Sequence, residues 1–474
     1  MLQKLFKLKE NNTNVRTEII AGIATFMTMA YILVVNPMTI ANINAGASVQ
    51  LNNAVFLATA ISAAIGTLFM AFLANKPFAL APGMGLNTYF ASIVALIMVD
   101  TKLSYDEAFQ GGLAIILISG ILFTALTLFK IREKIVDAIP TGVRFGITAG
   151  IGLMLVNVGL SSAVYGEKGD SFTIIGFFSK GARDTHTAME AAGADYALLI
   201  VYIITFFIGL FAIAVLNHKK IKGSILYGMI ISAIAYFIGG SMIGEDVFAP
   251  LKNSSFLPQF GDLADKTLFK FNFSALFEMG ALAAIMTIIT FCMVDMFDTI
   301  GTLLGTAGKA GMLDKDGKME NMGKALLSDS LATCVGACTG TSTVTTFIES
   351  ASGIEEGGRT GLTPVVTAIL FLACIFLAPV AAIIPAPATA AALVFVGVLM
   401  LSSLQFIDYT DFSQSVPVVL MLAFMMLTSS IGNGIGIGLI TYSIIKLCTG
   451  KYKDVSIITI ILSLLFIAKF FIIY

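Results

Sequence analysis

The chain has 474 residues, of which 57% are hydrophobic and 12% are charged, and its formal net charge is −1. Soluble domains carry about 25% charged residues, so this composition excludes a soluble protein and indicates one that is integral to a lipid bilayer. The balanced charge offers no basic surface for nucleic acid, which is therefore excluded as a partner.

Apolar runs long enough to cross a bilayer recur along the whole chain. A transmembrane helix needs about 20 predominantly apolar residues, and by this measure we expect fourteen spans. A final apolar run at 455–473 carries Lys469, and it is either a fifteenth crossing or an interfacial helix. The expected spans are 18–36, 53–73, 78–98, 110–130, 141–162, 196–216, 223–243, 279–304, 323–340, 344–356, 362–383, 388–405, 413–430 and 432–448.

Lysine and arginine positions orient these spans. Lys4, Lys7, Lys9 and Arg16 precede the first span, whereas the first loop on the opposite side, 37–52, has no basic residue. Cytoplasmic loops of multi-pass proteins carry the excess of basic residues. We therefore predict a multi-pass protein of the cytoplasmic membrane with its N-terminus in the cytoplasm.

The third span is interrupted. Its stretch Asn75–Phe90 contains Pro82, Gly85 and Asn87 where a plain membrane helix would continue. Proline removes a backbone donor and glycine loosens the chain, and such a break survives in a bilayer only inside protein or beside a wet cavity. Interrupted helices of this kind mark binding sites in transporters. We expect an extended crossing at 82–85 whose free N–H groups, including that of Gly85, face a ligand.

A weak internal repeat accompanies this interruption. Ile139–Pro140 recurs 245 residues later as Ile384–Pro385, and a Leu-Met-Leu triplet follows each copy. The interrupted third span then corresponds to the short tenth span. Because seven is an odd number of spans, the second set of seven must be inverted in the membrane. These features favour a 7+7 inverted repeat.

Span eight carries two carboxylates at membrane depth, Asp295 and Asp298. Ionisable residues there are costly and mark functional sites. Their i, i+3 spacing places both on one helix face, and two acids so close cannot both ionise cheaply, so one can hold a proton near neutral pH. The competing interpretation is a helix-end pair in interfacial water. The apolar run Ala281–Val294 favours the deep, functional pair without deciding which acid carries the proton.

Span ten supplies a third acid, Glu349, directly after the hydroxyl-rich segment Thr341–Thr346. Such a segment suits an extended crossing into a half-helix, whose N-terminus presents free N–H groups and a positive dipole to a ligand. We expect Glu349 to be a ligand or proton site. Asn87 both donates and accepts, so with the acids it suits a planar ring with N–H and C=O edges. Phe347 could stack on that ring, although plain packing is the alternative for any phenylalanine.

Three blocks, Asn75–Asn87, Asp295–Thr302 and Phe347–Thr363, together resemble the nucleobase–cation symporter-2 family. The similar branch is that of the hypoxanthine, guanine and adenine permeases of the azaguanine-resistance type, and the resemblance covers nearly the whole chain. It implies an all-α polytopic membrane protein with fourteen transmembrane segments in two inverted sevens and short strands in spans 3 and 10. The base would bind between spans 3, 8 and 10.

The family fold also implies domain limits, with spans 1–4 and 8–11 forming a core and spans 5–7 and 12–14 forming a gate. The C-terminal hydrophobic segment is left unassigned. The expected segments are the cytoplasmic N-terminus 1–17, the core 18–130, the gate 131–243, an extracellular loop 244–278, the core 279–383, the gate 384–448 and the C-terminal segment 449–474.

By motif, the family's substrate acids correspond to Asp298 or Asp295 and to Glu349, and the purine branch's asparagine corresponds to Asn87. The uracil and xanthine branches have a histidine near the position of Thr302, and this difference favours purines. The resemblance thus implies a purine importer coupled to H+, with Na+ as the alternative ion, and no metal or organic cofactor. The family sometimes dimerises through its gate, so a homodimer is one expected state.

Three other functions are weighed against this hypothesis. Another nucleobase symporter, for uracil or xanthine, is the nearest alternative. An anion exchanger or channel of the same fold is disfavoured because three acids would line its site. An intramembrane aspartyl enzyme is disfavoured because Asp295 and Asp298 lie on one helix and a Gly-x-Gly-Asp motif is absent. We therefore expect a transporter and not an enzyme.

Overall fold

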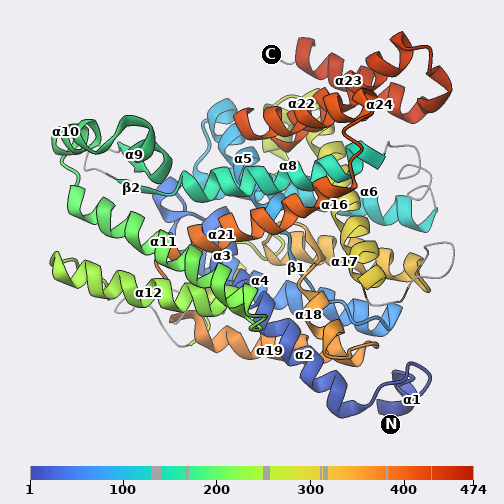
Figure 1. Cartoon of the computed structure of the whole chain (residues 1–474), viewed down its shortest axis with the longest axis horizontal. Helices are drawn as coiled ribbons and strands as arrows, with labels where there is room; N and C mark the ends of the chain where they lie inside the picture. Colours follow the sequence, from blue (N-terminus) through green and yellow to red (C-terminus); the bar gives the residue numbers. More distant parts are fainter. Residues whose placement is uncertain are drawn as a thin grey trace.

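The computed structural model of the chain describes residues 2–129, 141–165, 170–248, 257–309, 312, 319–379, 383–428 and 430–472. Within these residues the protein is predominantly helical and has two small two-stranded sheets (Figure 1). Ile139–Pro140, one half of the repeat signature, lies outside the described residues.

The N-terminal part of the chain contains long apolar helices and a pair of short helices after the second sheet. These elements are α1 (Leu2–Leu5), α2 (Val15–Met29), α3 (Ile32–Ile40), α4 (Val49–Phe69), β1 (Leu80–Pro82), α5 (Met84–Thr101), α6 (Tyr105–Leu128), α8 (Thr141–Leu160), β2 (Ala163–Tyr165), β3 (Ser171–Thr173), α9 (Ile174–Lys180), α10 (Ala182–Ala192), α11 (Tyr196–His218) and α12 (Ser224–Met242).

The C-terminal part has one short strand, β4, which lies between helices as β1 does in the N-terminal part. Its elements are α14 (Phe260–Lys266), α15 (Ser274–Glu278), α16 (Ala281–Lys309), α17 (Met322–Thr339), β4 (Val344–Thr346), α18 (Ser350–Glu355), α19 (Leu362–Ala373), α21 (Ala386–Met400), α22 (Phe412–Thr428), α23 (Ile431–Cys448) and α24 (Ile457–Ile472).

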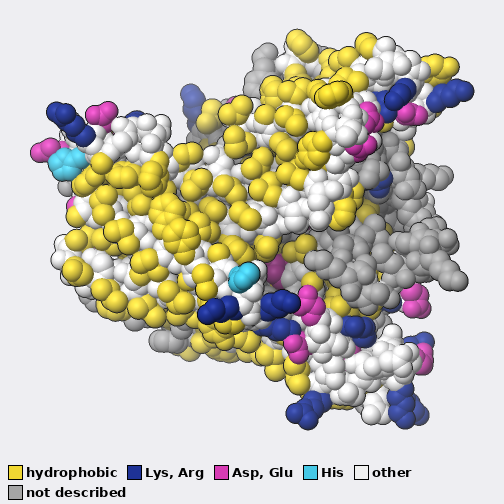
Figure 2. All heavy atoms as spheres, viewed as in Figure 1, with side chains coloured by type: hydrophobic (Ala, Val, Ile, Leu, Met, Phe, Trp, Pro, Cys, Tyr) yellow, Lys and Arg dark blue, Asp and Glu magenta, His cyan; other side chains and the backbone are white. Residues whose placement is uncertain are grey.

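The described residues include ten helices long and apolar enough to cross a membrane, together with three shorter apolar helices. Figure 2 shows hydrophobic side chains covering the face over α11 and α12, with charged side chains gathered toward the ends of these helices. Exposed side chains on this face include Ile204, Phe211, Ile234 and Ile238. A band of exposed apolar side chains bounded by charge is what a lipid-facing surface requires, so the chain has a polytopic membrane fold.

The helices form two packed groups. In the first, α2, α4 and α6 pack against α17, α18 and α19 of the second half of the chain. In the second, α8, α11 and α12 pack with α21, and α8 also packs with α22. Helices α5 and α16 of the first group contact α8 of the second, and so the surface between the groups runs past the interrupted span and the span-eight acids.

Strands β1 and β4 pair antiparallel, with Leu80 opposite Thr346 and Pro82 opposite Val344. All six residues of the two strands are buried. The short strands expected in spans 3 and 10 are therefore both present, and each is followed by a helix, α5 or α18. A proline is tolerated in β1 because a two-stranded ribbon leaves one side of each strand without a partner strand.

Asn75 ends the helical turn before β1. Its backbone adopts φ 51°, a left-handed conformation in which asparagine is favoured among non-glycine residues. Its side chain accepts a hydrogen bond from the N–H of Gly361 (2.8 Å) and donates one to the carbonyl of Phe6 (3.1 Å). The turn is thus fixed by contacts with two distant segments.

One boundary differs from the sequence-based expectation. Asn36–Pro37 was expected to end the first span, but both residues lie inside α3, which continues to Ile40. The first span instead has a break at Ala30–Tyr31, between α2 and α3. Pro37 lies inside this nine-residue helix, where its missing N–H removes the backbone bond to the carbonyl of Leu33. Asn36 is held inside by donating to the hydroxyls of Thr59 and Thr341, at 2.8 Å each.

Candidate substrate site

The two acids of span eight lie on α16 but have different surroundings. Asp295 is fully buried, and the hydroxyl of Thr333 on α17 donates to its Oδ2 at 2.8 Å. Asp298, one turn further along, is only half-buried. A Cβ placed on Gly83, at the junction of β1 and α5, would lie 3.8 Å from Asp298 Oδ2. Asp298 is therefore the acid that faces the interrupted third span.

Glu349 approaches the same region from the end of β4. It is half-buried and is the N-cap residue of α18, which packs against α16, the helix that carries Asp298. The hydroxyl of Tyr31, at the break between α2 and α3, donates to Glu349 Oε1 at 2.8 Å. The structure thus brings together acids from spans eight and ten, which the sequence singled out independently.

Asn87 lies in the first turn of α5 and is fully buried. Its Oδ1 accepts a hydrogen bond from the hydroxyl of Ser342, and its Nδ2 lies 3.4 Å from the carbonyl of Pro82. The carboxamide therefore connects the two crossings. The cap of α5, Gly83, provides no side-chain hydrogen bond to the first turn, so the N-terminal N–H groups of this helix keep the positive end of its dipole available to a ligand.

A fourth acid, Asp329 on α17, was missed by the sequence reasoning. It is fully buried, and its Oδ1 accepts from both the backbone N–H (2.9 Å) and the hydroxyl (3.0 Å) of Thr346. Its Oδ2 accepts from the hydroxyl of Thr299 on α16 at 2.5 Å. Asp329 thus fastens β4 to α16. The signal that could have found it is the rule applied to span eight, because Asp329 is a carboxylate inside an expected span.

The other residues expected to contact the substrate are Gly85, Phe347 and Thr302. A Cβ on Gly85 would lie 2.1 Å from Ile151 Cγ2 of α8, so this glycine permits close helix packing rather than forming an extended crossing. Residues 84–85 are helical, and the extended part covers Leu80–Pro82. The backbone of Phe347 bonds to Ala79, and its ring is buried in a hydrophobic cluster. Thr302 is buried one turn beyond Asp298.

A cavity of about 1280 Å³ opens between the two helix groups. Leu33, Thr88 and Ser92 line it from the first group, and Asn157 and Thr389 line it from the second. Thr88 directly follows Asn87 in α5, but the carboxylates Asp295, Asp298 and Glu349 do not line the cavity. Its polar lining is mostly amides and hydroxyls, which suit an uncharged, hydrogen-bonding solute.

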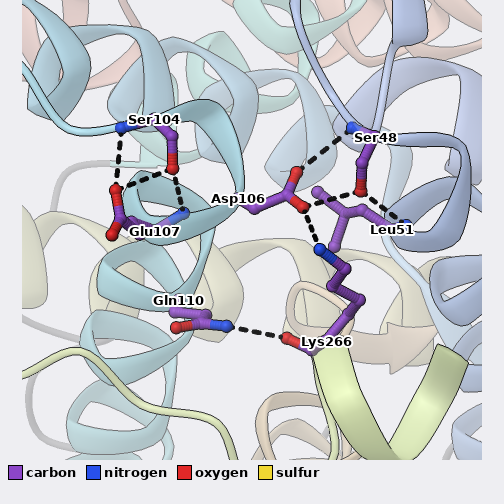
Figure 3. A network of polar contacts seen from close by, with 7 residues as sticks. All are labelled: Ser48, Leu51, Ser104, Asp106, Glu107, Gln110 and Lys266. Atoms are coloured by element: carbon purple, nitrogen blue, oxygen red, sulfur yellow. Dashed lines mark hydrogen bonds and ion pairs between the residues drawn. The ribbon is translucent and has the colours of Figure 1, made fainter.

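A polar network lies at the start of α4, next to Val49 and Gln50, which line the cavity (Figure 3). Asp106 accepts from the Ser48 N–H (3.1 Å), the Ser48 hydroxyl (2.6 Å) and Lys266 Nζ (2.9 Å). Ser104 and Glu107 form a capping box at the start of α6. These contacts join α4, α6 and α14, and this part of the first helix group is therefore expected to behave as one rigid unit.

No group of three or more His, Cys, Asp or Glu side chains suited to a metal ion occurs in the part of the chain that the structure describes. The carboxylates of the site are instead surrounded by threonine hydroxyls and a tyrosine. Such a site offers acceptors to the N–H groups of an organic ligand and positions for a proton.

Comparison with known proteins identifies the family. A model of a permease family matches residues 16–437. The chain belongs to the nucleobase–cation symporter-2 family of permeases. Adenine permease AdeQ of Escherichia coli is 37% identical to this permease, covering 99% of this chain and 96% of the relative. Guanine/hypoxanthine permease PbuO of Bacillus subtilis is 36% identical, covering 99% and 100%.

Solved structures share the fold of this permease. The transmembrane domain of the cyanobacterial bicarbonate transporter BicA matches with a TM-score of 0.63 at 16% identity, covering 90% of this chain and 97% of that one. The murine anion transporter Slc26a9 in its inward-facing state matches with a TM-score of 0.59 at 13% identity, covering 92% and 68%. At these identities the likeness establishes the fold alone.

Proposed function

We propose that this permease is a secondary transporter that imports purine nucleobases, with hypoxanthine, guanine and adenine as the expected substrates. The observation that carries this proposal is the meeting of Asp298 and Glu349, from two different spans, beside the β1–β4 crossing. Relatives that match almost the entire chain are named adenine permeases and guanine/hypoxanthine permeases.

The recognition chemistry follows from the donors and acceptors of the site. A purine presents N–H groups on some edges and ring nitrogens or a carbonyl on others. Its N–H groups would donate to Glu349 and Asp298, and its acceptors would face the N-terminal N–H groups of α5 and the amide of Asn87. Thr302 and Phe347 border the same site in this proposal, whereas Gly85 acts through packing on α8.

Proton coupling is the expected energy source. Moving a bare carboxylate through a low-dielectric region is costly, so a proton and an uncharged base would move together. Asp298 is the better candidate for the proton, because it is half-buried beside Gly83 while Asp295 already accepts from Thr333. Sodium is the alternative coupling ion.

The architecture proposed for transport is fourteen spans in a 7+7 inverted repeat, with a cytoplasmic N-terminus. The antiparallel pairing of β1 with β4 supports it, because inversion of the second repeat makes corresponding strands run in opposite directions. In this proposal the first helix group would form the core and the second would form the gate, a division that the contacts within each group support. Dimerisation would use the gate.

Alternating access fits the asymmetry between the two ends of the molecule. The cavity opens between the helix groups on one side of the site. Elsewhere on the surface between the groups, Lys222, before α12, forms an ion pair with Glu356, after α18. We assign the cavity to an outward-open state, in which this ion pair and the contact of Gly223 with Met27 close the cytoplasmic side.

Uptake of radiolabelled hypoxanthine into cells lacking their own purine permeases tests the proposal. Excess unlabelled adenine or guanine should reduce uptake, and uracil or xanthine should not. Glu349→Gln should abolish uptake or reduce it by more than tenfold. Glu355→Gln, an exposed acid in the same segment, is the matched control and should have no effect. Inhibition by uracil or xanthine alone would assign the protein to those bases.

The coupling ion is tested separately. A protonophore should abolish purine accumulation, whereas removal of sodium should not. Accumulation driven by a sodium gradient in the presence of the protonophore would overturn proton coupling. Chloride or bicarbonate exchange in liposomes without purine uptake would support the anion exchanger suggested by the fold of BicA.

A further inference from the structure

Tyr31 lies at an irregular point of the first span and contacts the proposed substrate acid directly. It follows the last residue of α2 by two positions and precedes α3, and its side chain is 1% exposed. Its hydroxyl donates to Glu349 Oε1 at 2.8 Å across a sequence separation of 318 residues. A buried phenol normally requires a hydrogen-bond partner, and here that partner is a carboxylate of the site.

The contact fixes how Glu349 is presented. A phenol has a single O–H, and it is directed to Oε1. Among the described residues, no other side chain donates to the Glu349 carboxylate, so Oε2 has no competing side-chain donor. A carboxylate has about four lone-pair positions, so with Tyr31 and the backbone of Glu349 itself as donors it can still accept a hydrogen bond from a ligand.

The backbone of Glu349 lies beside the same helix end. The hydroxyl of Thr28, in the last turn of α2, lies 3.4 Å from the carbonyl oxygen of Glu349. On the opposite side, Ser350 bonds to the N–H of Ala79, which precedes β1. Glu349 therefore lies between the first span and the β1 crossing, and Tyr31 is the component that contacts its side chain.

We propose that Tyr31 is a positioning residue for substrate recognition, holding Glu349 by Oε1 so that Oε2 is the oxygen presented to an N–H of the base. This inference rests on the proposed function, because it assigns Glu349 to purine binding. A positioning role for Tyr31 can be distinguished from a structural role by measurement. A positioning residue changes the affinity for the base, whereas a structural residue changes only the stability of the fold.

Tyr31→Phe is the central variant because it removes one oxygen atom and keeps the ring. Tyr105→Phe is the matched control, since Tyr105 is also buried and its hydroxyl donates to the carbonyl of Ile40 at 3.0 Å, away from Glu349. Hypoxanthine binding to the purified full-length proteins is measured by calorimetry, and the melting temperature of each protein without hypoxanthine is measured in parallel.

We expect Tyr31→Phe to weaken hypoxanthine binding about 5- to 20-fold, which is the range for losing a hydrogen bond to a charged group that takes part in recognition. Tyr105→Phe should bind within about twofold of wild type, while both variants melt at lower temperature. In uptake assays Tyr31→Phe should raise KM and leave Vmax within about twofold, because the missing contact acts on binding. Equal affinity changes in the two variants would overturn the inference.

A second measurement changes the ligand instead of the protein. Hypoxanthine analogues methylated at N1, N7 or N9 each lack one N–H donor. For the analogue that lacks the N–H facing Glu349, the effect of Tyr31→Phe on affinity should fall to less than about twofold, because coupled groups are not additive. A full 5- to 20-fold effect with every analogue would refute positioning through Glu349. If wild-type protein binds none of the purines, the proposed function fails instead.

Discussion

The two crossings that meet at the site have the same backbone form but opposite chemistry. The β1 crossing consists of apolar residues, Phe78 to Pro82, and is held mainly through its backbone, with Thr67 bonding both the N–H and the carbonyl of Leu80 at 2.9 Å. The β4 crossing is rich in hydroxyls, and its side chains bond to residues of four helices. These partners are Asn36 of α3, Asn87 of α5, Thr299 of α16 and Asp329 of α17.

This difference separates two ways of keeping extended chain inside a membrane protein. Backbone groups away from water must be satisfied, and in β1 this is achieved by a neighbouring strand and one threonine. In the β4 crossing the side chains do more, because four of the five hydroxyls between Thr341 and Thr346 bond to other helices. Substitutions in the β1 crossing should therefore act by steric crowding. Substitutions in the β4 crossing should act by removing hydrogen-bond partners.

The largest effect is expected at Asp329, on which β4 depends. Asp329→Ala leaves the N–H and hydroxyl of Thr346 without their acceptor, whereas the hydroxyl of Thr299 can still donate to the carbonyl of Asp295. Each buried group left unsatisfied costs about 1–3 kcal/mol, so we expect purine uptake to fall by more than tenfold and the melting temperature to drop. Asp329→Asn, which keeps one acceptor oxygen, should retain more activity. Normal uptake by Asp329→Ala would show that β4 does not depend on this acid.

The β1 crossing is tested by crowding it. A Cβ on Gly83 would lie 2.7 Å from Thr345 Cγ2, so Gly83→Ala should push the crossings apart at a cost of about 1–3 kcal/mol and lower uptake about tenfold. Thr345→Ser removes that methyl group and keeps the hydroxyl that lies 2.9 Å from Thr299 Oγ1. The double variant should recover uptake to within about threefold of wild type. Failure to recover would mean that the added methyl group also disturbs Leu86 or Asp298, whose nearest atoms lie 3.5 and 3.8 Å from that Cβ.

A smaller effect is expected at Ser342, whose hydroxyl donates to Asn87. Ser342→Ala should raise the KM for hypoxanthine about three- to tenfold, which corresponds to one buried hydrogen bond. The neighbouring Thr343 supplies the control, because its buried hydroxyl has no hydrogen-bond partner among the described residues. Thr343→Val should leave KM unchanged. If the two variants behave alike, the hydroxyl content of this crossing matters only for packing.

The smallest effect concerns how each crossing contacts the second helix group. Helix α5 does so by close packing of Gly85 on Ile151, and the segment after α18 does so by the ion pair of Glu356 with Lys222. Partly exposed ion pairs contribute up to about 1 kcal/mol, so Lys222→Gln should change the external KM by less than about fivefold. The charge-reversed pair Lys222→Glu with Glu356→Lys should restore it. A larger loss that reversal does not repair would point to another role for Lys222.

Sequence reasoning located the crossings because proline, glycine and clustered hydroxyls are unusual inside apolar spans. It found Asp298 and Glu349 by the cost of burying a carboxylate, and the structure brings these two acids together. Asp329 obeys the same rule and was overlooked. The contact of Tyr31 with Glu349 could not have been found this way, because a tyrosine in an apolar span carries no cost and its partner is 318 residues away. Gly85 was assigned to the wrong feature because a glycine that allows packing and one that allows extension look alike in sequence.

The antiparallel ribbon also has a consequence for biosynthesis. It joins Ala81 to Thr345, which is 264 residues later in the chain. A ribosome adds about 5–20 residues per second, so β1 waits roughly 13–50 s in or near the membrane before its partner strand exists. During that interval its backbone groups need water or the surface of the insertion machinery. A chain terminated before β4 is therefore expected to be recognised by membrane proteases and degraded. Each half of this permease should resist proteolysis only when the other half is present.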